Sequence, residues 1–149
     1  MDKFYSNPQG GDRIRVSVDE KTQDIVACLV KKKLVHRHIY CPRSEFDVRI
    51  SVNMEISMPK PSMGGKELLS RRKDRVSYSH QHVQVDLTQV TSMFGEKQHG
   101  GLTYELEMEI RDIPRLKQEW ENRKQGIQNN YERWIEEFVY GIRALCRIR

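Results

Sequence analysis

Alternation of apolar and polar residues dominates the chain from Arg13 to about Arg111, and this period of two predicts β-strands. Six segments carry the alternation: 13–19, 25–35, 48–57, 73–79, 83–90 and 103–111. Clusters rich in Pro, Gly, Asp and Ser separate them, as is typical of turns. The pattern favours a sheet with two chemically different faces, because residues i and i+2 of a strand point to the same side.

The spacing of apolar residues changes after Pro114. From Leu116 to Leu145 they recur at three-, four- or seven-residue steps, which is typical of one face of a long helix. Gly126 lies inside this stretch, as the residue at which such a helix would bend or split. The sequence therefore predicts one β-dominated α+β domain, with strands over about 13–111 and a C-terminal helix over about 114–148.

Composition excludes several classes of protein. Of the 149 residues, 37% are hydrophobic, which is too many for a disordered chain, and no apolar run reaches the ~18 residues of a membrane span. The N-terminus lacks the apolar region of a secretory signal. Three widely spaced cysteines, Cys28, Cys41 and Cys146, form no CxxC pair and favour a reducing compartment. The net charge of +5 is compatible with a phosphate-rich partner.

The last predicted strand carries an unusual row of like charges. One face holds Tyr104, Leu106, Met108 and Ile110, and the other holds Thr103, Glu105, Glu107, Glu109 and Arg111. Same-face neighbours lie ~7 Å apart, so each like-charge contact costs roughly 2 kcal/mol at an effective dielectric of 20. Three carboxylates in line therefore indicate a bound cation, and hard oxygen ligands suit Mg²⁺ or Mn²⁺.

Basic residues occupy the polar faces of other strands: Arg15, Arg49, Lys73 and Arg75. If the sheet curls with its polar faces inward, one cavity would hold carboxylates that bind a metal and cations that bind a phosphate chain. Enzymes that transfer phosphoryl groups use both kinds of group. The apolar outer faces would then need a cover, for which the C-terminal helix is the candidate. The alternative is an ordinary antiparallel sheet with one solvated face.

Five stretches resemble a known family: Arg13–Asp19 (RIRVSVD), Phe46–Glu55 (FDVRISVNME), Lys73–Tyr78 (KDRVSY), Val85–Thr88 (VDLT) and Tyr104–Glu109 (YELEME). In this order, over about residues 12–112, they are similar to the beta subunit of the fungal mRNA-capping RNA 5′-triphosphatases, which are triphosphate tunnel metalloenzymes. The resemblance implies an antiparallel β tunnel with a C-terminal helix. It also implies Mg²⁺- or Mn²⁺-dependent removal of the terminal phosphate from 5′-triphosphate RNA, the first step of mRNA 5′ capping. A guanylyltransferase partner, a possible homodimer and a nuclear location follow from the same resemblance.

The resemblance also implies roles for individual residues. The acidic row and one further carboxylate would bind the metal. Glu109 would be a direct ligand, Glu107 and Asp86 would hold metal-bound water, and Glu105 would complete the row. Glu55 would orient or activate the attacking water, and Arg15, Lys73 and Arg75 would grip the terminal phosphate. Weaker supporting roles fall to Lys31, Arg49 and Thr88.

Two departures from the family pattern stand out. Gln84 occupies a position that is basic in some members, and no ExE pair precedes Glu105, although the family's first strand carries one. Six strand candidates are also fewer than the roughly eight of a small closed barrel. The sequence thus predicts an incomplete barrel, the C-terminal part of a catalytic domain, and leaves open whether this chain alone is active. The alternative is a non-catalytic tunnel-like module for nucleic-acid binding or dimerisation.

Overall fold

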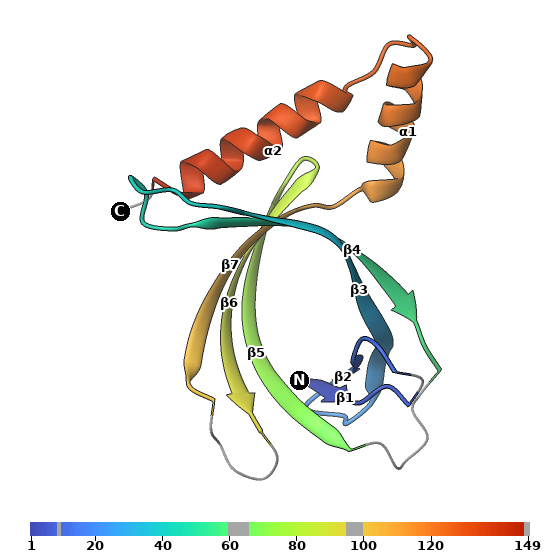
Figure 1. Cartoon of the computed structure of the whole chain (residues 1–149), viewed down its shortest axis with the longest axis vertical. Helices are drawn as coiled ribbons and strands as arrows, with labels where there is room; N and C mark the ends of the chain where they lie inside the picture. Colours follow the sequence, from blue (N-terminus) through green and yellow to red (C-terminus); the bar gives the residue numbers. More distant parts are fainter. Residues whose placement is uncertain (9, 60–65, 95–99, 148–149) are drawn as a thin grey trace. The chain divides into compact units, whose positions relative to one another are not determined.

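The computed structural model describes residues 1–8, 10–59, 66–94 and 100–147. These residues form seven strands and two helices: β1 (Asp2–Tyr5), β2 (Ile14–Val18), β3 (Ile25–Ile39), β4 (Val48–Ser57), β5 (Glu67–His80), β6 (Val83–Met93), β7 (Leu102–Ile110), α1 (Ile113–Lys124) and α2 (Tyr131–Leu145) (Figure 1). The chain divides into two compact units. The first unit comprises Met1–Ile39, Arg49–Arg75 and Thr88–Glu105, and the second comprises Tyr40–Val48, Val76–Leu87 and Leu106–Arg149.

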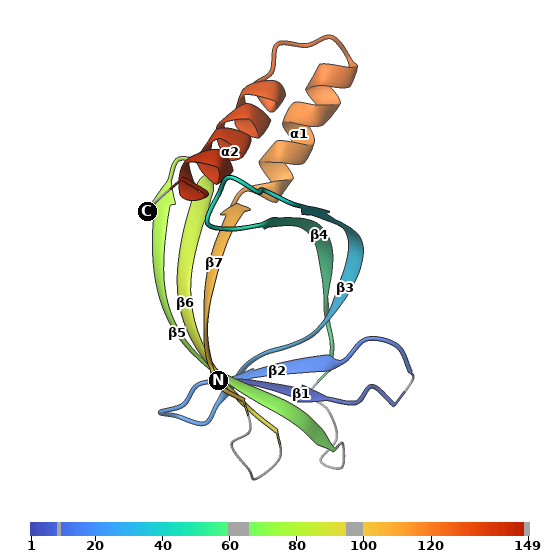
Figure 2. The same cartoon turned by 60° about the vertical axis from the view of Figure 1, so that its left-hand side comes forward.

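The strands form one sheet in the order β4-β3-β2-β1-β5-β6-β7. Within the first unit, β1 pairs antiparallel with both β2 and β5, and β2 pairs antiparallel with β3. Figure 2 shows the short β1 lying beside β2. The ammonium group of Met1 donates a hydrogen bond of 2.8 Å to the carbonyl oxygen of Val18, which holds the end of the chain against β2. The sequence did not predict β1, because Asp-Lys-Phe-Tyr is four residues long and does not alternate.

The core of the first unit lies on one face of β2. Ile14, Val16 and Val18 are buried there together with Val30 of β3, which pairs with Ile14. Tyr5, Cys28 and Met58 pack against this group. The predicted apolar face of segment 13–19 is therefore confirmed, and the register places the polar residues Arg15 and Ser17 on the opposite face.

Strand β6 buries its polar face. Asp86 and Thr88 are each 2% exposed, whereas the intervening Leu87 is 47% exposed. An ordinary sheet with one solvated face would show the reverse. Apolar residues of β4 are exposed as well, among them Val52 and Met54. These exposures favour a buried polar face in β6, whereas in β7 Glu105 is half-buried and Glu107 and Glu109 are exposed.

The C-terminal region forms two helices where the sequence predicted a single one over about 114–148, so that prediction is wrong in its extent. Gly126 adopts a φ of 69°, in the left-handed region that favours glycine. Its N–H bonds the carbonyl oxygen of Arg123 at 3.1 Å, and the N–H of Ile127 bonds that of Asn122 at 2.9 Å. This pair of bonds is a Schellman motif, which ends α1. A split at Gly126 had been one of the two expected outcomes.

The two helices lie side by side in the second unit (Figure 2). The α1 helix begins after Asp112, whose side chain accepts a 2.9 Å hydrogen bond from the backbone N–H of Arg115. The α2 helix approaches β7 so closely at Gly141 that an added Cβ would collide with Met108. It thereby covers part of the apolar face of β7, as expected for a C-terminal helix. No helix in the described part of the chain is long and apolar enough to cross a membrane.

Candidate functional site

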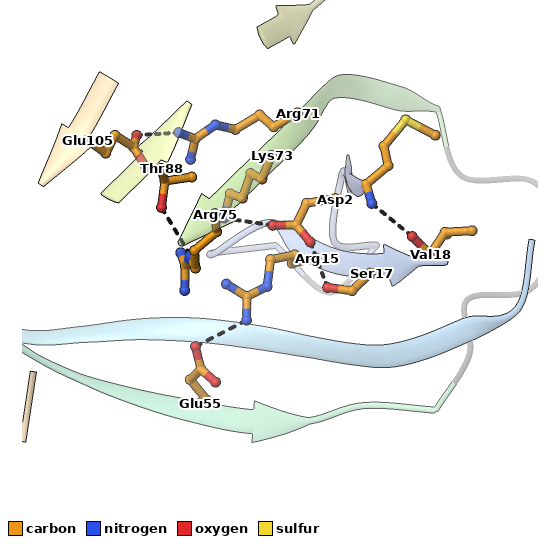
Figure 3. Close-up of polar contacts among 11 residues, drawn as sticks. Asp2, Arg15, Ser17, Val18, Glu55, Arg71, Lys73, Arg75, Thr88 and Glu105 are labelled. Atoms are coloured by element: carbon orange, nitrogen blue, oxygen red, sulfur yellow. Dashed lines mark hydrogen bonds and ion pairs between the residues drawn. The ribbon is translucent and has the colours of Figure 1, made fainter. Parts of the chain in front are cut away.

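Four cations of the first unit project from one face of the sheet at strands β2 and β5 (Figure 3). We call them the basic cluster: Arg15, Arg71, Lys73 and Arg75. Arg71, Lys73 and Arg75 share a face because they alternate along β5. Strand β1 joins the two sides, since Asp2 pairs with Arg71 on β5 and with Ser17 on β2. Insertion of β1 between β2 and β5 thus positions the cluster around Asp2.

Carboxylates pair with three of these cations. Asp2 Oδ2 lies 2.8 Å from Lys73 Nζ, and Asp2 Oδ1 accepts a 2.7 Å hydrogen bond from Ser17 Oγ. Glu55 Oε1 lies 3.2 Å from a terminal nitrogen of Arg15, and Glu105 forms an ion pair with Arg71.

The fourth cation, Arg75, donates a 3.0 Å hydrogen bond from Nε to Thr88 Oγ1. Hydrogen bonds and ion pairs thus fix the positions of all four cations of the cluster.

One donor in the basic cluster lacks an acceptor. Nε of Arg15 is buried and makes no hydrogen bond within the described part of the chain. A buried donor left unpaired costs about 1–3 kcal/mol, so an anion bound here would gain that contact. The side chains of Arg15, Arg71 and Lys73 are 21%, 24% and 23% exposed, which leaves the cluster open to a ligand.

Asp2 is held in its charged form. Burial by itself would raise the pKa of Asp2, but hydrogen bonds from Lys73 and Ser17 and the charges of Lys73 and Arg15 outweigh it, so the pKa is lowered. An ionised Asp2 orients Lys73 and lowers the net positive charge of the cluster. Without this carboxylate, the cations would repel one another more strongly.

Two carboxylates of the second unit accept hydrogen bonds from the same side-chain amide. Gln84 Nε2 donates a 2.8 Å hydrogen bond to Asp86 Oδ1 and a 3.4 Å one to Glu109 Oε1. Its Oε1 accepts a 3.3 Å hydrogen bond from Ser79 Oγ, which fixes the orientation of the amide. Gln84 therefore bridges two of the predicted metal ligands as a neutral donor, where a basic residue had been expected.

Comparison with known proteins identifies the family. The family model described as "mRNA capping enzyme, beta chain" matches residues 1–148. The chain belongs to this family. The family inferred from the five stretches is thereby confirmed.

Among the relatives of this capping-enzyme family, the mRNA-capping enzyme subunit beta of Schizosaccharomyces pombe is 32% identical over 151 residues, covering 99% of this chain and 48% of that protein. The Cryptococcus neoformans subunit is 36% identical over 118 residues, covering 77% of this chain and 29% of that one. The solved structure of the S. pombe Pct1 RNA triphosphatase superposes with a TM-score of 0.89 at 32% identity, over 99% of this chain and 56% of that one. The predicted fold class is thus confirmed, and the chain spans about half the length of its S. pombe relative.

The donor chemistry of the capping-family carboxylates fits a hard divalent cation such as Mg²⁺ or Mn²⁺. In the part of the chain that the structure describes, however, no three His, Cys, Asp or Glu side chains are grouped so as to hold a metal ion. Glu105 is paired with Arg71, while Asp86 and Glu109 share the Gln84 amide. Asp86 and Glu109 are therefore two predicted metal ligands that the structure brings to one hydrogen-bond donor.

The structure groups most of the predicted phosphate ligands and leaves two apart. Lys31 and Arg49 are exposed, and neither side chain makes a hydrogen bond or ion pair with another described residue. Sequence reasoning missed Asp2 and Arg71. Arg71 could have been found from its alternation with Lys73, had the predicted strand begun before residue 73. No local signal marked Asp2, because only long-range pairing brings β1 to β5.

Proposed function

We propose that this chain takes part in hydrolysis of the terminal phosphate of 5′-triphosphate RNA, the first step of mRNA 5′ capping. In this reaction water attacks the terminal phosphorus, and the bond from that phosphorus to the bridging oxygen breaks. The products are inorganic phosphate and RNA with a 5′-diphosphate end. The observation that best supports the proposal is the basic cluster, which gathers four cations and includes the unpaired Nε of Arg15.

In the proposed roles, Arg15, Lys73 and Arg75 bind the terminal phosphate and offset the charge that develops there. Thr88 holds Arg75 through its hydroxyl, and Asp2 holds Lys73. Glu55, about half exposed beside Arg15, orients the attacking water and accepts its proton. Arg71 positions Glu105 through their ion pair.

Mg²⁺ or Mn²⁺ is the proposed cofactor, with Glu105, Glu107, Glu109 and Asp86 as its candidate ligands. When bound, such an ion supplies positive charge that stabilises the transferring phosphoryl group. Gln84 orients Asp86 and Glu109 through the hydrogen bonds of its amide. Lys31 and Arg49 remain candidates for contacts farther along the RNA.

The proposed partners follow from the family. A capping enzyme subunit is expected to act with a guanylyltransferase on nascent RNA in the nucleus, and homodimerisation belongs to the same proposal. One solved relative is S. pombe Pct1 in complex with the Spt5 CTD, with a TM-score of 0.88. A corresponding peptide is a candidate partner for this chain. That the chain is the C-terminal part of a single catalytic domain stays a prediction.

The second candidate function is a non-catalytic module that binds RNA. The net charge of +5 and the basic cluster are the features that such a module would use. Such a module would bind RNA through its backbone and would not distinguish one 5′ end from another.

Binding in the presence of EDTA separates the two functions. We expect 5′-triphosphate RNA to bind at least about tenfold more tightly than 5′-hydroxyl RNA of the same sequence, because charge-assisted hydrogen bonds from the basic cluster act only on the triphosphate. Fluorescence anisotropy at fixed ionic strength measures both affinities. Equal affinities would favour the RNA-binding module instead.

A further inference from the structure

A cavity of about 660 Å³ lies in the second unit and has no role in the proposed reaction. Its lining comes from the turn between β5 and β6, the residue after β7, and the N-terminal parts of α1 and α2 with the residues that cap them. All these residues belong to the same unit, so the cavity is formed within it. Its lining differs from the basic cluster in containing a buried aromatic pair.

Arginine dominates the charge of this cavity. Arg111, Arg115 and Arg133 line it, together with the carboxylates of Asp112 and Glu137. Both carboxylates are engaged: Asp112 caps α1, and Glu137 accepts a 2.8 Å hydrogen bond from Arg133 Nε that lowers the pKa of Glu137.

The Arg111 guanidinium, in contrast, makes no hydrogen bond or ion pair with any residue that the structure describes. Arg115 and Arg133 each have a carboxylate partner, Glu119 at 4.0 Å and Glu137 at 2.8 Å, so Arg111 is the arginine of this lining that is available to an anionic ligand.

His82 adds an unsatisfied polar atom. The residue is 8% exposed, and its Nε2 is buried without a hydrogen-bond partner among the described residues. The Glu137 carboxylate lies 3.4 Å from this atom, which is too far for a good hydrogen bond. Because a buried polar atom without a partner is unfavourable, a ligand oxygen in the cavity would supply the missing acceptor.

Two helices begin at the cavity. The α1 helix has 12 residues and starts after Asp112, and the α2 helix has 15 residues and starts after Asn130, and both of these capping residues line the cavity. Asn130 makes no side-chain capping bond, and the N–H of Tyr131, the first residue of α2, donates a 3.2 Å hydrogen bond to Asn129 Oδ1 instead. The partial positive charge at a helix N-terminus favours anions, in the same direction as the arginines.

The aromatic pair makes nucleobase stacking an unsuitable mode of binding. Trp134 is 9% exposed, with His82 stacked on it at 4.4 Å and the Arg115 guanidinium 5.4 Å from its ring centroid. Its ring therefore offers no free face to a base, and stacking platforms are what single-stranded nucleic acid requires. The cavity instead presents guanidinium groups, which match a tetrahedral phosphate bidentately.

We propose that this cavity binds a phosphate dianion, either free phosphate or a phosphate monoester, through Arg111, Arg115 and His82. The unpaired Nε2 of His82 and the unpaired Arg111 guanidinium are the two observations that carry this proposal. A ligand bound in the cavity is expected to change the NMR signal of Trp134, because its ring contacts two of the proposed ligand-binding residues, His82 and Arg115.

The test uses the whole chain labelled with ¹⁵N, whose two tryptophans give two indole N–H signals in NMR spectra. Inorganic phosphate, a short peptide with one phosphoserine, and the same peptide without phosphate are titrated separately at constant ionic strength. We expect the Trp134 signal to shift and saturate with the two phosphate-bearing probes, while the Trp120 signal stays in place. Arg111→Gln and Arg115→Gln should each weaken binding about tenfold, as expected for loss of a charge-assisted hydrogen bond.

Arg123→Gln is the matched control, because Arg123 lies 5.5 Å from the Trp120 ring and does not line the cavity. It should leave the titration unchanged. Tighter binding of the phosphopeptide would identify a phosphorylated side chain of a partner protein as the ligand, and equal binding would identify free phosphate. A Trp134 signal that does not saturate with either probe, or equal effects of Arg111→Gln and Arg123→Gln, would overturn the proposal.

Discussion

Replacing Glu109 with Gln is expected to lower release of the terminal phosphate from 5′-triphosphate RNA by about a hundredfold or more. The amide keeps the shape of the side chain and still offers an oxygen to Gln84, which now lies 3.4 Å from Oε1. The negative charge of this hard oxygen ligand is lost, and with it the contribution of Glu109 to metal binding. The same replacement at Glu107 should act similarly, since both lie on the acidic face of β7.

Two measurements check the Glu109 prediction. Phosphate release gives the effect on activity, and electron paramagnetic resonance gives Mn²⁺ affinity, which should fall by roughly ten- to a hundredfold. Glu136→Gln is the control, because Glu136 is exposed on α2 and makes no hydrogen bond or ion pair with another described residue. Unchanged release and unchanged Mn²⁺ affinity in both Glu107→Gln and Glu109→Gln would show that the acidic row does not bind the metal.

Replacing Lys73 with Ala is expected to weaken binding of 5′-triphosphate RNA by about tenfold or more while leaving 5′-hydroxyl RNA nearly unaffected. Lys73 is half-buried and held by Asp2 at 2.8 Å, so its charge is fixed within the basic cluster. Arg15→Ala should act in the same direction, because it removes the unpaired Nε and frees Glu55 to repel the phosphate.

The neighbouring Arg72 provides a matched control for Lys73. It lies on the same strand, points to the opposite face, is 68% exposed and pairs with Glu20. Arg72→Ala should therefore change the affinity for the two RNAs equally and only slightly, as expected for an exposed charge. If Lys73→Ala and Arg72→Ala gave the same result, the basic cluster would not be the triphosphate site.

The sequence was sufficient to predict features that depend on local pattern. The alternation of β2 identified its buried face correctly, because Ile14, Val16 and Val18 are spaced by two. The row of carboxylates in β7 suggested buried polar faces, and the 2% exposure of Asp86 and Thr88 agrees with that suggestion for β6, although Glu107 and Glu109 of β7 are themselves exposed.

Features that depend on long-range pairing could not be predicted in this way. The four-residue β1 is stabilised by pairing with β2 and β5, so its own residues carry no strand signal. The position of Asp2 in the basic cluster follows from that pairing.

Gly126 illustrates a different ambiguity, since a glycine within a helical pattern either bends the helix or ends it, and only the left-handed φ of 69° distinguishes the two.

The most direct test of the account is release of terminal phosphate from 5′-triphosphate RNA in Mn²⁺, Mg²⁺ and EDTA. It should be made with this chain alone and with a form extended at its N-terminus by an ExE-bearing strand, which would add carboxylates to those of β6 and β7. The account predicts metal-dependent release of inorganic phosphate by at least the extended form, with RNA 5′-diphosphate as the other product. No release by either form, or equal release in EDTA, would contradict it.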